Sequence, residues 1–116
     1  MRRAGAVTAG VGLFGAMALA AADIPTRYSG SFPSAGRITS ITGTFTGRAL
    51  TLKYTAIRGT RFIPTTASYA CAPAPPNKSK CTGQFKTDDG QFAGRAFVRV
   101  TWKGGQPVSM HFGKMH

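Results

Sequence analysis

The stretch that decides the fold is residues 82–112, which read TGQFKTDDGQFAGRAFVRVTWKGGQPVSMHF. We expect three strands in it, over Thr82–Lys86, Gln91–Trp102 and Pro107–Phe112. The first two are joined by the acidic turn Thr87–Gly90, and Gly104 and Gly105 precede the third. Asp-Gly between extended runs is a strong hairpin signal, because both residues tolerate the positive φ angles that such turns require. The stretch therefore predicts consecutive antiparallel strands.

The longest of these strands has two faces of opposite chemistry. Its even-numbered positions are apolar or small: Phe92, Gly94, Ala96, Val98, Val100 and Trp102. Its odd-numbered positions are largely cationic: Ala93, Arg95, Phe97, Arg99, Thr101 and Lys103. A period of two is typical of a half-buried antiparallel strand, because successive side chains point to opposite sides of a sheet. We predict that the apolar side faces the core and the cationic side faces solvent.

Other segments also have the pattern of strands. Arg48–Arg58 alternates in the same way. One of its faces is mostly apolar: Leu50, Leu52, Tyr54 and Ala56. The strand that follows is interrupted at Pro64, which cannot donate to a sheet ladder, so we expect that strand at an edge or with a break. Ile38 and Ile41 are three apart and break the alternation, so either a β-bulge intervenes or this segment is partly irregular.

These patterns together predict the fold class. Strand signals recur roughly every 8 to 12 residues, and no stretch after Ala22 has helical periodicity. We therefore predict one small all-β domain over residues 23–116. Its expected architecture is an antiparallel β-barrel or β-sandwich of about six to eight strands, with one disulfide.

Residues 1–22 have the layout of a cleavable signal peptide. Met1-Arg2-Arg3 is cationic, Ala4–Met17 is apolar and uncharged, and small residues follow up to Ala22. The alternative is an uncleaved membrane anchor, because the uncharged run is just long enough to span a bilayer. We predict cleavage, since the Gly and Ala content makes the run only weakly apolar. The domain that remains is then expected to be periplasmic or secreted.

The chain is strongly basic. Its 15 Lys and Arg residues against 3 acidic residues give a formal net charge of +12. A surface so unbalanced attracts anionic polymers, so nucleic acid, lipopolysaccharide, acidic glycans and an anionic envelope surface are candidate partners. The alternative is a structural or inhibitory module that binds another protein and whose basicity only provides solubility. Charge by itself does not choose between these two classes.

The cationic face of the long strand is the first candidate binding site. We predict that Arg95, Phe97, Arg99 and Lys103 form one stripe on it. Residues two apart on a strand are separated by roughly 6.5 to 7 Å, which is close to the spacing of charged groups along an extended polymer. An aromatic ring between two arginines is suited to stacking on a sugar or base. The alternative is that Phe97 packs inward in a closed barrel and the arginines are simply solvated.

The segment between the two cysteines is the second candidate site. In an exported chain Cys71 and Cys81 are expected to form a disulfide, which would stabilise the fold by roughly 2 to 3 kcal/mol. We expect the loop between them to be held against the sheet and stiffened by its three prolines. Lys78 and Lys80 then make it either a rigid basic recognition loop or a stapled connection whose lysines keep it soluble.

Metal and catalytic chemistry find little support in the sequence. Nine residues separate Cys71 from Cys81, where structural zinc sites use about two to four, and His111 and His116 lie near the end of the chain. We expect no metal and no cofactor. Paired carboxylates, a Gly-x-Ser-x-Gly elbow and a phosphate loop are missing, and turn geometry explains Asp88 and Asp89. We therefore predict a binding protein and not an enzyme.

Overall fold

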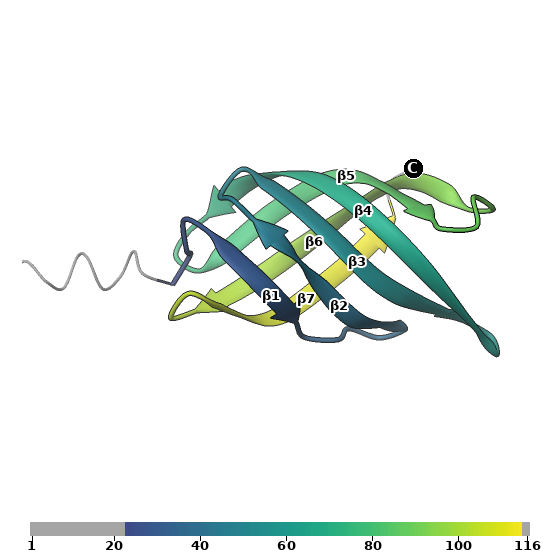
Figure 1. Cartoon of the computed structure of the whole chain (residues 1–116). Helices are drawn as coiled ribbons and strands as arrows, with labels where there is room; N and C mark the ends of the chain where they lie inside the picture. Colours follow the sequence, from purple (N-terminus) through teal and green to yellow (C-terminus); the bar gives the residue numbers. More distant parts are fainter. Residues whose placement is uncertain (1–22, 115–116) are drawn as a thin grey trace, which may run out of the picture.

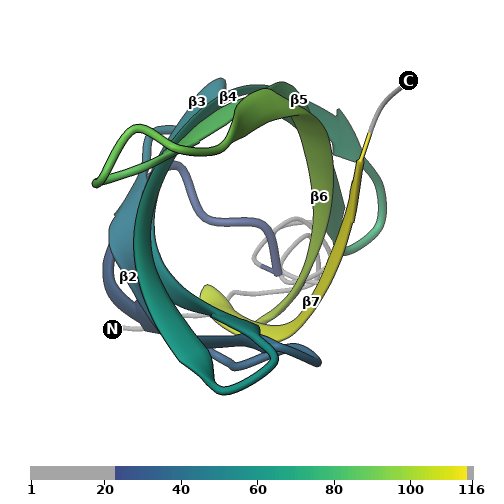
Figure 2. The same ribbon diagram turned by 90° about the vertical axis from the view of Figure 1, so that its right-hand side faces the viewer.

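In the computed structural model, which describes residues 23–114, seven strands form one antiparallel sheet. Their spatial order follows the chain: β1 (Tyr28–Phe32), β2 (Ile38–Phe45), β3 (Ala49–Arg58), β4 (Arg61–Ala74), β5 (Lys78–Thr87), β6 (Ala93–Lys103) and β7 (Gln106–Lys114). The sheet curls on itself into a half-barrel (Figures 1 and 2). The all-β prediction is confirmed. The predicted signal peptide, residues 1–22, lies outside the described residues.

The architecture is a single curled sheet and not a sandwich of two sheets. The first and last strands approach each other at one end. There Asp23 accepts hydrogen bonds from the backbone N–H groups of Gly104, at 3.1 Å, and Gly105, at 3.3 Å. Within residues 23–114, however, no β-ladder joins β1 to β7. The part of the chain that the structure describes contains no helix long and apolar enough to cross a membrane.

The core lies on the concave side of the sheet, where alternate residues of each strand meet. The predicted faces of β3 and β6 are confirmed, since Leu50, Leu52, Val98 and Val100 are fully buried. Trp102, which is 1% exposed, lies at the centre of an aromatic cluster. The centroid of its ring system is 4.8 Å from that of Phe45, 5.8 Å from Tyr28 and 6.2 Å from Phe32. Its indole N–H donates a 3.0 Å hydrogen bond to the buried Ser79 hydroxyl.

A β-bulge explains the irregular spacing in β2. The register between β2 and β3 shifts between Thr39 and Thr42, and Ser40 has a φ angle of 54°. The extra residue lets Ile38 and Ile41, three apart in sequence, both point to the core side. The sequence allowed either a β-bulge or a partly irregular segment here, and the structure has the β-bulge.

The prediction for Pro64 is corrected in one respect. The strand that contains it, β4, is continuous and central, and it pairs with β3 through Arg61–Ala70 and with β5 from Thr65 onward. The Pro64 carbonyl accepts a 2.9 Å hydrogen bond from the Asp88 N–H. The ring nitrogen of Pro64, which has no hydrogen to donate, therefore faces the same side, toward the end of β5. Because β5 ends at Thr87, no ladder hydrogen bond is lost there.

The segment between the cysteines is also different from the prediction. It is not a loop held against the sheet but the tip of the β4–β5 hairpin, with its turn at residues 75–77. The predicted disulfide is confirmed, and Cys71 lies directly opposite Cys81 with their Cα atoms 4.0 Å apart. Strand structure persists through this segment because β5 also pairs with β6 from Lys78 onward.

The predicted acidic turn joins β5 to β6 and is stabilised by its own side chains. The Asp89 carboxylate accepts a 2.9 Å hydrogen bond from the Gln91 N–H and a 2.7 Å bond from the Thr87 hydroxyl. These bonds, with a further contribution from Arg61 at 4.0 Å, hold the pKa of Asp89 below its usual range. Gly90 supplies the positive φ angle of the turn, 77°.

Candidate functional site

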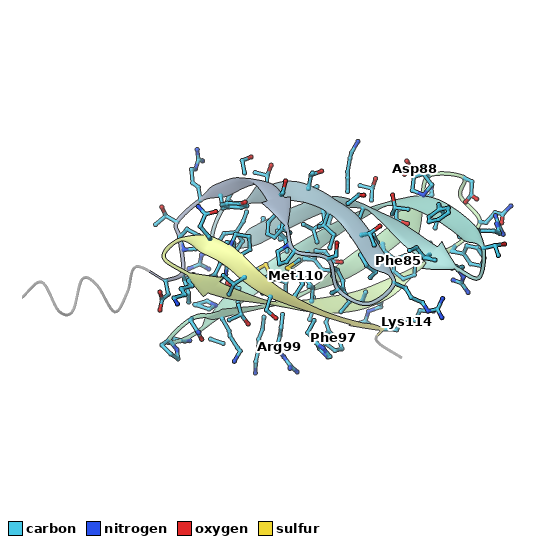
Figure 3. The ribbon with its side chains drawn as sticks, turned by 90° about the horizontal axis from the view of Figure 1, so that it is seen from below. Phe85, Asp88, Phe97, Arg99, Met110 and Lys114 are labelled. Atoms are coloured by element: carbon cyan, nitrogen blue, oxygen red, sulfur yellow. A yellow bond between two sulfur atoms is a disulfide. The ribbon has the colours of Figure 1, made fainter. Side chains whose placement is uncertain are left out.

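The outer, convex face of β5 and β6 contains all the residues predicted to bind. Strand alternation places their side chains on one side of the sheet: Lys78, Lys80, Arg95, Phe97, Arg99 and Lys103. The five cations are exposed and Phe97 is partly buried. Figure 3 shows Phe97 and Arg99 projecting side by side away from the sheet. We call this set the cationic face.

The structure brings together two candidate sites that the sequence had kept apart. Lys80, expected on a separate basic loop, lies directly opposite Arg99 of the predicted stripe. Neighbouring strands are about 4.8 Å apart, so the lysine and the arginine belong to one surface. Arg99 in turn lies opposite His111 on β7. A row of three basic side chains therefore crosses β5, β6 and β7.

This row has no acidic counterpart. The three acidic residues of the chain are Asp23, near one end of the sheet, and Asp88 and Asp89, in the β5–β6 turn. Among residues 23–114 the single ion pair joins Arg61 to Asp89. Like charges directly opposite each other destabilise a strand pair. The cationic face thus holds repulsion that an anion would relieve.

Phe97 lies on the outer face, so the alternative that it packs inward is wrong. Its ring covers Gly113 of β7, where a Cβ atom would collide with the ring. The guanidinium carbon of Arg99 lies 5.8 Å from the ring centroid, and the His111 ring lies 6.0 Å away. The aromatic ring is therefore held in place between basic neighbours, and part of it stays open to solvent.

A shallow hollow marks the middle of the cationic face. It has a volume of about 200 Å³, lies between β5 and β6, and is bounded by the side chains of Lys80, Thr82, Phe97 and Arg99. A phosphate, sulfate or carboxylate group placed there would meet an ammonium group, a guanidinium group and a hydroxyl. Such charge-assisted contacts are stronger than neutral hydrogen bonds.

Two further basic residues share this face and were missed by sequence reasoning. Lys86 has the same parity as Lys78 and Lys80 along β5, which is a signal that the sequence contained. His111 was considered only as a metal ligand, and its position opposite Arg99 depends on the β6–β7 register. The other predicted members lie farther from the hollow: Arg95 is opposite Gln84, and Lys103 is opposite Gln106.

The cationic face offers charge, hydrogen-bond donors and an aromatic ring. Within the described part of the chain, no three His, Cys, Asp or Glu side chains lie close enough together to bind a metal ion. Ser79 is buried and accepts the Trp102 N–H, so its hydroxyl does not reach the surface. No family model, curated protein or solved structure matches the chain.

Proposed function

We propose that this protein binds an anionic polymer through its cationic face. The observation that supports this most directly is the Lys80–Arg99 pair, two like charges in register with no carboxylate nearby on the same face. Within residues 23–114 neither of these two exposed cations forms an ion pair, so both are suited to an external anion. A nucleic acid, an acidic glycan or the anionic part of lipopolysaccharide supplies such groups repeatedly.

The spacing of the cationic face fits a polymer better than a single small anion. Along β6, Phe97 lies two residues from Arg95 and two residues from Arg99. Each of these two-residue intervals is roughly 6.5 to 7 Å long. Across the sheet Lys80 adds a charge about 4.8 Å away. The cationic face thus binds several anionic groups of one polymer together, and the counterions of those groups are released.

The proposal includes export of the domain to the periplasm or the medium. The Cys71–Cys81 disulfide is consistent with an oxidising compartment, where such bonds persist. The signal-peptide pattern of residues 1–22 supports the same location. Envelope glycans and lipopolysaccharide are among the anionic polymers that an exported protein meets.

The first test compares two double variants that remove the same charge. Lys80→Gln with Arg99→Gln alters the cationic face, while Arg27→Gln with Arg48→Gln removes two exposed arginines elsewhere. Binding of labelled single-stranded DNA and of heparin is measured by fluorescence anisotropy between about 50 and 200 mM salt. For DNA the face variant is expected to lower the salt slope by about 1.4, because each lost phosphate contact on a single strand removes about 0.7.

The control variant is expected to change affinity much less than the face variant. Equal losses in the two variants would mean that only net charge matters, and the assignment of the cationic face would then be wrong. Binding of neither polymer by the unaltered protein at low salt would overturn the proposed function itself.

A second test addresses the aromatic ring. Phe97→Leu keeps an apolar side chain over Gly113 but removes the stacking surface. Affinity for single-stranded DNA is expected to fall at least fivefold with an unchanged salt slope, because stacking contributes about 1 to 3 kcal/mol per base. Phe62→Leu is the control, since Phe62 is 70% exposed on β4 and lies outside the cationic face. Equal effects of the two substitutions would contradict a stacking role.

A protein partner is the second candidate function, and one observation favours it. Among the described strands β7 pairs only with β6, so its other edge has no partner strand, and Val108 on it is 50% exposed. An extended segment of another protein can add to such an edge. Pull-down from the native compartment at low and high salt separates the two functions. Capture that persists at high salt would favour a protein partner over the polymer.

A further inference from the structure

A second cavity lies inside the half-barrel, away from the cationic face. Its volume is about 250 Å³, and it shares no residue with that face. The wall is mostly apolar and includes Ile38, Ala56, Ile63, Phe85, Ala96 and Phe112. Trp102 contacts Phe45, and Phe45 pairs with Leu50 at the start of β3. Ala56 and Arg58, which line the cavity, lie at the other end of β3. The cavity thus occupies the end of the sheet opposite the Trp102 cluster.

Two cations stand at the mouth of this cavity. Arg58 continues the inward-facing positions of β3, and Lys114 lies opposite the inward-facing Ala96 at the end of β7. Both line the cavity, and both are exposed at its rim. The Arg58 guanidinium carbon lies 4.2 Å from the centroid of the Phe92 ring, which fixes the arginine beside the opening. Figure 3 shows Lys114 at the end of its strand, close to Phe85 in this view.

Among residues 23–114, the acidic side chains near the mouth are engaged elsewhere. The acids on the neighbouring β5–β6 turn are Asp88 and Asp89. Asp89 is engaged with Thr87, Gln91 and Arg61. Asp88 accepts a hydrogen bond from the Thr66 hydroxyl. Within residues 23–114, neither Arg58 nor Lys114 forms an ion pair.

The inner part of the cavity is uncharged. Tyr54 lines it, and burial raises the pKa of this phenol, so the hydroxyl stays neutral. Burial and the nearby Tyr54 raise the pKa of Tyr69, so its buried hydroxyl also stays neutral. An anionic group would be poorly solvated at this depth. An anionic group of a ligand would therefore meet positive charge only at the mouth of the cavity.

We propose that this cavity binds a single-tailed amphiphile with an anionic head, of the class of medium-chain carboxylates. Its tail lies along Phe85 and Phe112, and its carboxylate lies between Arg58 and Lys114. The volume exceeds the roughly 150 Å³ of a cavity that holds benzene and is just below the roughly 300 Å³ at which pockets for drug-sized ligands begin. It therefore has room for one short tail. This inference is independent of the proposed polymer function.

The test uses octanoate and its neutral counterpart octan-1-ol, with binding measured by isothermal titration calorimetry. Octanoate is expected to bind about tenfold more tightly than octanol, because two cations contact its head. Arg58→Gln with Lys114→Gln is expected to abolish this preference while octanol binding stays unchanged. The control is Arg95→Gln with Arg99→Gln on the outer face, which is expected to retain the preference.

A cavity-filling variant provides a second readout. Ala96→Leu places extra carbon atoms in the cavity and is expected to weaken both ligands at least tenfold. If this variant fails to fold, the two charge variants still decide the head-group assignment. The proposal is overturned if the unaltered protein binds neither ligand at millimolar concentration, or if octanoate has no preference over octanol. Equal losses from the rim and outer-face charge variants would also overturn it.

Discussion

Replacing Trp102 with Ala is expected to lower the free energy of unfolding by about 3 to 5 kcal/mol, the usual cost of truncating a buried aromatic residue. The indole is 1% exposed and lies against the rings of Phe45, Tyr28 and Phe32. Its removal leaves a cavity in the core and leaves the buried Ser79 hydroxyl without its donor. Small domains have about 5 to 15 kcal/mol in total, so this variant should be barely stable. Urea unfolding followed by far-ultraviolet circular dichroism measures the loss.

Two further variants test the cause of this loss. Trp102→Phe keeps an aromatic ring but removes the N–H donor, and it is expected to cost less than Trp102→Ala. Phe62→Ala removes a ring that is 70% exposed, so the free energy of unfolding should change by no more than about 0.5 kcal/mol. A loss below about 1 kcal/mol for Trp102→Ala would contradict the central place of the aromatic cluster in the core.

Much of the fold could be predicted because strand alternation is a local property. In β6, core-facing apolar residues such as Val98 alternate with outward-facing residues such as Arg99, and the apolar ones are buried. The bulge in β2 was detectable for the same reason, since Ile38 and Ile41 violate a period of two. Pro64 was misjudged because a proline is restrictive only on the side that its nitrogen faces, and that side depends on where the neighbouring strand ends.

The candidate site was predicted residue by residue but not as one surface. Whether Lys80 faces Arg99 depends on the register of β5 against β6, and a shift of one residue would turn the lysine to the other side of the sheet. The prolines between the cysteines suggested a separate loop, so the pairing of this segment with β6 was not predicted. The inner cavity was not predictable either. Arg58 and Lys114 are far apart in sequence, and only the curl of the sheet brings both to one opening.

Removing the disulfide by replacing Cys71 and Cys81 with Ala is expected to lower the free energy of unfolding by about 2 to 3 kcal/mol. The bond closes a loop with a sequence separation of 10, and closing such a loop restricts the unfolded chain by about this amount. Cys81 is also 1% exposed, so some core packing is lost with its sulfur. Differential scanning calorimetry should show a fall in Tm of about 4 to 8 °C for each kcal/mol.

The same double variant separates stability from the proposed function. Lys80 keeps its position opposite Arg99 through the β5–β6 ladder, which runs from Lys78 to Lys86. Cys81 lies in this ladder opposite Val98, but its disulfide joins β5 to β4 and not to β6. Well below the Tm, the salt slope for single-stranded DNA should therefore equal that of the unaltered protein, while amide exchange at the tip of the β4–β5 hairpin becomes faster. A reduced salt slope in the folded variant would instead mean that the disulfide positions the cationic face. Unchanged stability would show that the β5–β6 ladder already orders this hairpin without the covalent bond.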